Sequence, residues 1–226
     1  MDPLAGTPWS APSTVAGFAG GAPNTVLMNY AARLRGQRSE SRALDIGCGA
    51  GRNAVPLAQQ GWNVVGLDLS VPMLQAAQSR RSEASVRRCH VVLARMDTLP
   101  VASASMDLVI AHGIWNLSTS DAEFRRAVRE AARVARPGAG LFVFTFSRRT
   151  LPDSAMPEPG ETFIYSQFSG RPQCFLTEAQ LLAEMKDAGF ERDVDVPLVE
   201  HNLAPRGALP TTGAPVIYEA AFSLAG

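Results

Sequence analysis

The stretch Asp45-Ile46-Gly47-Cys48-Gly49-Ala50-Gly51 decides the fold of this chain. It ends a short apolar run at 42–46, which predicts a buried strand. Its three glycines alternate, so the backbone can turn sharply and approach a ligand without a Cβ atom in the way. In open α/β sheets, ligands bind where the carboxyl ends of strands meet helix N-termini. The stretch therefore predicts a ligand-binding loop at the end of a strand.

Strands and helices are expected to alternate along most of the chain. Strands are predicted at 42–46, 63–67, 89–93, 106–111, 141–146, 190–196 and 216–222. Helices are predicted at 24–36, 52–60, 70–80, from 120 to the stop at Pro137-Gly138, and from 177 to the stop at Gly189. Asn24 and Ser70 are expected as N-caps, and capping boxes begin at Ser120 and Thr177. This order predicts a doubly wound, mostly parallel sheet whose last strand is antiparallel, with helices on both faces.

Composition narrows the class of protein. The 226 residues have a formal net charge of +0 and 46% hydrophobic content, which is typical of one globular α/β unit. Because the charge is balanced, we expect no nucleic-acid partner and no membrane surface. The chain has 3 cysteines, whose wide spacing fits neither a disulfide framework nor a metal site. We expect reduced thiols, no signal peptide and a cytoplasmic location.

Two carboxylates indicate the kind of ligand. A dinucleotide fingerprint is Gly-x-Gly-x-x-Gly, whereas this loop is Gly-x-Gly-x-Gly and follows Asp45. Asp45 would repel a pyrophosphate but suits a cationic ligand that bears an ammonium and a sulfonium. Asp68 ends the next strand, 21 residues after Gly47, where it can accept hydrogen bonds from ribose hydroxyls. Asp68 also fits NAD, so a nicotinamide oxidoreductase stays open although the loop disfavours it.

Residues 43–54 resemble motif I of the class I S-adenosylmethionine-dependent methyltransferases. Asp68, Met96-Asp97, the strand at 106–109 and Arg136-Pro137-Gly138-Ala139-Gly140 resemble later motifs of that family, so the likeness covers residues 40–146. The resemblance implies a Rossmann-like class I methyltransferase fold with a seven-stranded sheet. It also implies that S-adenosyl-L-methionine is the cofactor and S-adenosyl-L-homocysteine the product.

The resemblance implies a set of cofactor-binding residues. They are Asp45, Gly47, Cys48, Gly49, Gly51, Asn53, Asp68, Leu69, Met73, Met96, Asp97, Ala111 and His112. Within that set, the loop meets the amino-acid end of the cofactor and Asp68 holds the ribose. Met96 and Asp97 contact the adenine, and His112 lies beneath the sulfonium.

The acceptor is expected to be a small molecule. The triplet Gly51-Arg52-Asn53 resembles the tellurite-resistance and thiopurine-like branch, whose substrates are soft nucleophiles such as thiols and selenium or tellurium species. An O- or N-methyltransferase of a natural product or other metabolite is the alternative. The strand at 106–111 leads into Ala111-His112-Gly113-Ile114 where methylases of DNA bases have Asn/Asp-Pro-Pro-Tyr/Phe, which counts against that activity. A non-catalytic cofactor-binding module stays open.

Candidate acceptor-site residues come from several segments. His112 and His201 are candidate catalytic residues, with a backbone-bonded or surface histidine as the alternative. Side chains expected near the acceptor are Tyr30, Trp115, Asn116, Arg148, Tyr165 and Phe168. Residues 37–226 are expected to form the methyltransferase domain, in which 147–176 can serve as a lid. Residues 1–36 are expected to form a flap and a helix. Because Trp9 and Phe18 are unusual in a disordered tail, we expect residues 1–25 to order over a bound ligand.

Overall fold

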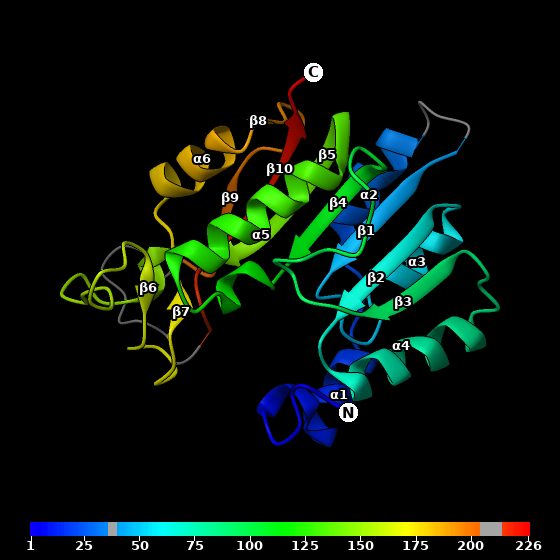
Figure 1. The fold of residues 1–226 in the computed structure, drawn as a ribbon, viewed down its shortest axis with the longest axis horizontal. Helices are drawn as coiled ribbons and strands as arrows, with labels where there is room; N and C mark the ends of the chain where they lie inside the picture. Colours follow the sequence, from blue (N-terminus) through cyan, green and yellow to red (C-terminus); the bar gives the residue numbers. More distant parts are fainter. Residues whose placement is uncertain (36–39, 204–213) are drawn as a thin grey trace.

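The computed structural model describes residues 1–35, 40–203 and 214–226. Its main sheet has the order β3-β2-β1-β4-β5-β10-β8, and β9 pairs with β10 (Figure 1). The strands are β1 (Arg42–Ile46), β2 (Asn63–Asp68), β3 (Cys89–Leu93), β4 (Met106–His112), β5 (Ala135–Phe146), β8 (Phe190–Arg192), β9 (Val199–His201) and β10 (Ile217–Leu224). Strands β1 to β5 pair in parallel, and β10 is antiparallel to both β5 and β8. The expected doubly wound sheet with an antiparallel last strand is confirmed, with β9 as an additional short strand.

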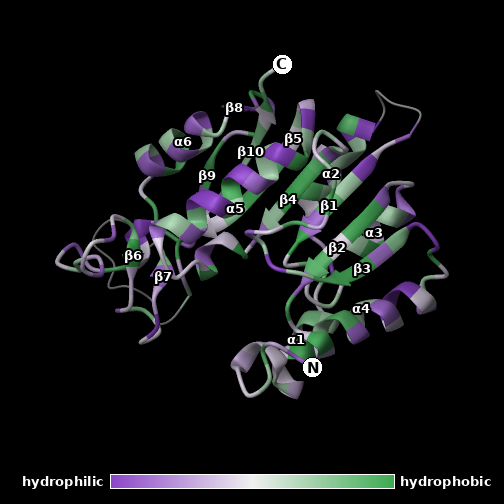
Figure 2. Ribbon diagram, in the orientation of Figure 1, coloured by the Kyte–Doolittle hydropathy of each residue, from purple (hydrophilic) through white to green (hydrophobic). Residues whose placement is uncertain are grey.

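Helices cover both faces of this sheet. They are α1 (Pro12–Ala19), α2 (Thr25–Arg35), α3 (Ala54–Gln59), α4 (Val71–Glu83), α5 (Asp121–Val134) and α6 (Glu178–Asp187), with 3-10 turns η1 (Pro8–Ser10), η2 (Trp115–Leu117) and η3 (Arg148–Thr150). Helices α5 and α6 bury apolar side chains in one core, and α2, α3 and α4 bury theirs in a second core on the opposite face. Figure 2 shows the consequence, since β4 is largely hydrophobic and α5 alternates between hydrophobic and hydrophilic residues.

The Pro137-Gly138 dipeptide lies inside a strand. The sequence predicted that this dipeptide ends a helix and that the next strand begins at 141, but α5 ends at Val134 and β5 begins at Ala135. Ala135 pairs with Met106, and the register then shifts before the next pair. Gly138 has a φ of +74°, which accommodates this irregularity. The strand is therefore longer than its apolar run.

The strand expected at 190–196 is shorter than predicted. It ends at Arg192, because Asp193 Oδ1 accepts the backbone N–H groups of Asp195 (2.9 Å) and Val196 (3.2 Å). This local turn takes donors that would otherwise extend the ladder. Further along the chain, β9 pairs antiparallel with β10. The sequence did not predict this short strand, because its residues show no clear alternation of apolar and polar side chains.

Helix caps largely follow the predictions. Asn24 Oδ1 accepts the Leu27 N–H at 2.8 Å, and the capping box at 177–180 is complete. The box at Ser120 is only half formed. Ser120 Oγ accepts the Glu123 N–H at 3.1 Å, but the Glu123 carboxylate binds the backbone and hydroxyl of Thr119. The sequence predicted where this helix starts, but it did not predict that the Glu123 carboxylate would bind Thr119.

The segment 147–176 packs around a small core of its own. It contains the hairpin of β6 (Ile164–Tyr165) and β7 (Gln173–Cys174), and Tyr165 is buried against Phe175. Arg148 organises this segment. Its guanidinium donates to the carbonyls of residues 151, 152, 153 and 155, and it lies 4.9 Å from the centre of the Tyr165 ring. These contacts give Arg148 a structural role in this segment.

Three further sequence expectations concern absences. In the part of the chain that the structure describes, no helix is long and apolar enough to cross a membrane. The same residues hold no group of three or more His, Cys, Asp or Glu side chains placed for a metal ion. All three cysteines are buried, and none of them forms a disulfide in the structure.

Replacing Arg148 by lysine tests its structural role. Lysine cannot donate to several carbonyls in a fixed fork, so we expect Arg148→Lys to lower the free energy of unfolding by about 1–2 kcal/mol. Amide hydrogen exchange in 148–168 should accelerate. Arg149→Lys is the control, because Arg149 is exposed and forms only a surface ion pair with Glu200. Equal effects of the two substitutions on exchange would contradict this role.

Candidate active site

A cavity of about 390 Å³ opens at the carboxyl ends of β1, β2 and β4. Of the predicted cofactor-binding residues, it is lined by Gly47, Gly49, Asp68, Leu69, Met73, Met96, Asp97 and His112. Of the other predicted residues, Cys48 and Ala111 are buried, Gly51 lies against Ala77 of α4, and Asn53 Oδ1 accepts the Asn24 N–H. The structure thus brings most of the predicted cofactor residues to one place.

The glycine loop depends on left-handed backbone. Gly47, Gly49 and Gly51 have φ values of +70°, +52° and +73°. A Cβ atom added to Gly47 would lie 2.7 Å from the Ile114 side chain, and one added to Gly51 would lie 3.2 Å from Ala77. Both the turn and the close approach of neighbouring segments therefore require glycine at these positions.

Asp68 lies at the end of β2 with its carboxylate held by two backbone groups. Its Oδ2 accepts the Gly49 N–H at 2.9 Å, and its Oδ1 accepts the Ser70 N–H at 2.8 Å. Burial raises its pKa, while these hydrogen bonds act in the opposite direction. Each oxygen keeps a further lone pair, so the carboxylate can also accept two ligand hydroxyls.

Asp45 and Arg52 form a pair of opposite charges beside the loop. Asp45 is buried, its Oδ2 has no hydrogen-bond partner, and burial raises its pKa to about 7 against the effect of Arg52. Arg52 lines the cavity, and no carboxylate among the described residues lies within ion-pair distance of it. A carboxylate oxygen without a hydrogen-bond partner and a guanidinium without an ion-pair partner are groups that can bind an ammonium and a carboxylate. The residues therefore fit the amino-acid end of S-adenosylmethionine.

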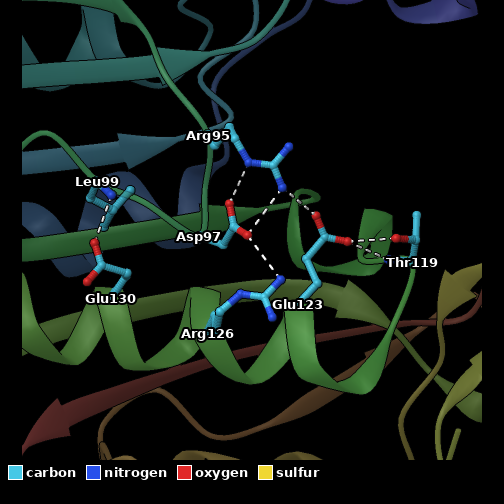
Figure 3. A network of polar contacts seen from close by, with 7 residues as sticks. All are labelled: Arg95, Asp97, Leu99, Thr119, Glu123, Arg126 and Glu130. Carbon is cyan, nitrogen blue, oxygen red and sulfur yellow. Dashed lines mark hydrogen bonds and ion pairs between the residues drawn. The ribbon is translucent and has the colours of Figure 1, made fainter.

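The opposite end of the cavity is held by an ion-pair network (Figure 3). Arg95 donates to both oxygens of Asp97, at 2.8 and 3.2 Å, and Arg126 donates to Oδ2 at 3.3 Å. Arg95 also reaches Glu123 at 3.1 Å. These contacts lower the pKa of Asp97, chiefly through Arg95. Asp97 is thus a fixed carboxylate beside Met96. Its partner Arg95 lies two positions away, whereas Arg126 comes from α5 and was not predicted as a partner.

His112 ends β4 and faces the cavity with one side of its ring against Phe144. The two rings are stacked with centroids 4.2 Å apart. Nδ1 lies 3.2 Å from Arg52 Nη2, and Nε2 lies 3.4 Å from Asn24 Nδ2. Burial and then the charge of Arg52 lower the pKa of His112 to about 4. The ring is therefore neutral at physiological pH in this arrangement.

The other residues predicted near the acceptor lie outside the cavity wall. Trp115 is fully buried against Phe124, and Asn116 is also buried. Tyr30 donates to the Phe222 carbonyl on the far side of the sheet. Arg148, Tyr165 and Phe168 belong to the 147–176 segment, and His201 pairs with Glu219 at 3.3 Å. None of them lines the cavity, because each is engaged with its own local core or partner.

The N-terminal residues contribute walls that local sequence patterns did not specify. Leu4, Trp9 and Phe18 line the cavity, and the rings of Trp9 and Phe18 meet edge to face at 6.2 Å. Helix α1 packs on α4, where Arg80 donates to the carbonyls of residues 19 and 21, both at 3.0 Å. In the sequence, Trp9 and Phe18 stand out in a segment of mostly small residues, and they were the signal that this segment contributes to the site.

Known proteins share this domain. The sequence pattern of the methyltransferase domain family matches residues 43–138. The malonyl-[acyl-carrier protein] O-methyltransferase of Pseudescherichia vulneris is 34% identical over 120 residues, which cover 52% of this chain and 44% of that protein. The ubiquinone biosynthesis O-methyltransferase of Azorhizobium caulinodans is 31% identical over 153 residues, which cover 66% and 58% respectively. The chain thus spans about half the length of the curated relatives it matches.

Solved structures share the fold over most of the chain. A methyltransferase from Methanosarcina mazei superimposes with a TM-score of 0.66 at 19% identity, covering 91% of this chain and 99% of that one. The 1,6-didemethyltoxoflavin-N1-methyltransferase of Burkholderia thailandensis, solved with S-adenosylhomocysteine, gives 0.62 at 19% identity and covers 88% and 78%. Residues 43–138 match the methyltransferase domain family, and the chain shares the Rossmann-like fold of these methyltransferase structures.

The pKa of Asp45 predicts how cofactor affinity depends on pH. Above about pH 7 Asp45 is ionised and can bind an ammonium, whereas below it binding must first displace a proton. The affinity for S-adenosylhomocysteine should therefore fall up to about tenfold per pH unit below that value. Calorimetry between pH 8 and pH 6 measures this. 5′-Methylthioadenosine, which lacks the amino-acid end, is the control and should bind with little pH dependence; equal slopes for both ligands would contradict the role of Asp45.

Proposed function

We propose that the chain transfers the methyl group of S-adenosylmethionine to a small-molecule acceptor. The observation that carries this proposal is the placement of complementary groups at and beside one cavity. Arg52 and Asp68 line the cavity and suit the carboxylate of the amino acid and the ribose. Asp45 is buried beside the loop, and its unpartnered oxygen suits the ammonium. The loop geometry and the domain family support the same cofactor. A nicotinamide oxidoreductase is disfavoured, because Asp45 would face a pyrophosphate.

The chemistry asks the protein mainly for positioning. The bound cofactor supplies a methyl group that is already activated by a sulfonium. Holding a nucleophile in line with that methyl group can contribute on the order of 7–11 kcal/mol. In this chain the loop, Asp68 and the flap would hold one reactant. The walls formed by Ile114, Leu117 and Phe144 exclude water from the other.

An organic acceptor with an oxygen nucleophile is our first candidate. Two relatives are named as O-methyltransferases, of malonyl-[acyl-carrier protein] and of ubiquinone biosynthesis. The cavity also has apolar walls, including Trp9 and Phe18, that suit an organic group. A soft nucleophile is the second candidate, which the triplet Gly51-Arg52-Asn53 favours.

An acceptor screen tests the proposed activity. We expect S-adenosylhomocysteine to form only when a suitable phenol, carboxylic acid, amine, thiol, selenite or tellurite is added. Asp68→Asn should raise the KM for the cofactor about tenfold or more, since a charge-assisted hydrogen bond contributes about 1.5–3 kcal/mol. Asp153→Asn, at an exposed site, is the control. Cofactor binding without turnover of any acceptor would favour a non-catalytic module, and absence of binding would contradict the proposal.

We further propose that residues 1–25 close over the bound cofactor as a flap. Trp9 and Phe18 are chymotrypsin sites within this segment, which contains no lysine or arginine. S-Adenosylhomocysteine should slow their cleavage. Arg80→Gln should accelerate it, because the substitution removes the hydrogen bonds that tether α1 to α4. The exposed Arg87→Gln variant is the control, and a cleavage rate that saturating ligand leaves unchanged would refute the flap.

A further inference from the structure

The ring of His112 lies between two hydrogen-bond donors. Arg52 Nη2 approaches Nδ1 at 3.2 Å, and a guanidinium can only donate. Asn24 Nδ2 approaches Nε2 at 3.4 Å. The orientation of the Asn24 amide is set by its partners, because Oδ1 accepts from Leu27 N at 2.8 Å and Nδ2 donates to Glu219 Oε2 at 2.6 Å. Neither neighbour can therefore accept a proton from the ring.

This arrangement fixes the tautomer of His112. A neutral imidazole has one lone pair and one N–H group. Because Arg52 is a charged donor and lies at the shorter distance, we expect Nδ1 to accept from Arg52 and Nε2 to carry the proton. The 3.4 Å approach of Asn24 is then a contact between two donors and not a hydrogen bond. The single basic site of the ring is thus occupied by Arg52.

Burial and the charge of Arg52 lower the pKa of His112, whereas a hydrogen bond to its own backbone acts in the opposite direction. Arg52 is the only cation in direct contact with the ring among the described residues, and Phe144 covers one face. The Glu219 carboxylate is separated from the ring by the Asn24 amide and is also paired with His201. Asp45 acts on Arg52 from the loop side. Burial and the positive charge of Arg52 therefore keep His112 unprotonated, with a pKa of about 4.

A carboxylate that binds in the cavity competes with His112 for the guanidinium of Arg52. A carboxylate accepts hydrogen bonds from a guanidinium more strongly than an imidazole nitrogen does. We infer that Arg52 couples the binding of the cofactor's carboxylate to the ability of His112 to accept a proton from the acceptor. The inference rests on the proposed function, which brings that carboxylate into the cavity. Arg52 is a positioning residue in this scheme, and His112 is the catalytic residue.

The step that follows balances for an acceptor that arrives protonated. The acceptor's oxygen lone pair forms the bond to the methyl carbon, and the electron pair of the methyl–sulfur bond stays on sulfur. The acceptor's proton passes to the vacated Nδ1 of His112. The resulting imidazolium is tolerated because the charge of Arg52 is then neutralised by the carboxylate. Before that carboxylate binds, the cavity holds no base at Nδ1.

Imidazole NMR of ¹⁵N-histidine-labelled protein tests the inference without turnover. The chain has 3 histidines, so His112→Asn assigns the signals. In the ligand-free protein we expect the Nε2–H tautomer and no titration of His112 above about pH 5.5, since its pKa is about 4. Saturating S-adenosylhomocysteine should shift the Nδ1 resonance and raise the proton affinity of His112 about tenfold. 5′-Methylthioadenosine, which has no carboxylate, should do neither.

Substitution of the arginine provides a second test. Arg52→Gln should raise the proton affinity of His112 in the ligand-free protein and abolish its response to S-adenosylhomocysteine. Arg87→Gln is the control, because Arg87 is exposed and does not line the cavity, and it should preserve the response.

The outcomes separate the inference from the proposed function. If S-adenosylhomocysteine binds by calorimetry and leaves the His112 signals unchanged, or if 5′-methylthioadenosine shifts them equally, the inference is wrong and the proposed function stands. If S-adenosylhomocysteine does not bind, the proposed function itself is contradicted. The comparison of the two ligands uses the unsubstituted protein, so it decides the question even if Arg52→Gln does not fold.

Discussion

Three left-handed residues within five positions set the conditions for the rest of this molecule. Gly47, Gly49 and Gly51 turn the chain back at the end of β1, so Asp45 lies beneath the loop while Asp68 of the next strand reaches up to it. The approach of Ile114 to the loop is possible only because Gly47 has no side chain. The position of the cavity, the placement of the Asp45 and Asp68 carboxylates, and the approach of the segment after β4 all depend on this turn.

The framework was predictable because it depends on local patterns. The loop, Asp68 and the Asn24 cap follow from residue types whose effects act within a few positions. The errors arose from one distant pairing and from one local turn that the apolar pattern does not reveal. Pro137-Gly138 continues into a strand because Ala135 pairs with Met106, and β8 ends early because Asp193 turns onto the chain that follows it.

The site was predictable in part, for the same reason. Loop geometry placed Asp68 and Met96 at the cavity, whereas burial and pairing decided the fate of other candidates. Trp115 became part of the core, and Arg148 became a scaffold for neighbouring carbonyls. The importance of Arg52 was not visible, because it derives from a histidine 60 positions away that faces the same cavity.

Among the residues that the structure describes, the side chains that line the cavity all come from positions 4 to 144. The described strands and helices that follow, from η3 to β10, complete the sheet and contribute to all three cores. The described C-terminal part acts on the cavity through packing and through Glu219, which orients Asn24 beside His112. The family pattern ends at residue 138, before this supporting part. An engineer who wishes to change this protein's ligand preference can therefore begin with the lining residues and leave the C-terminal support intact.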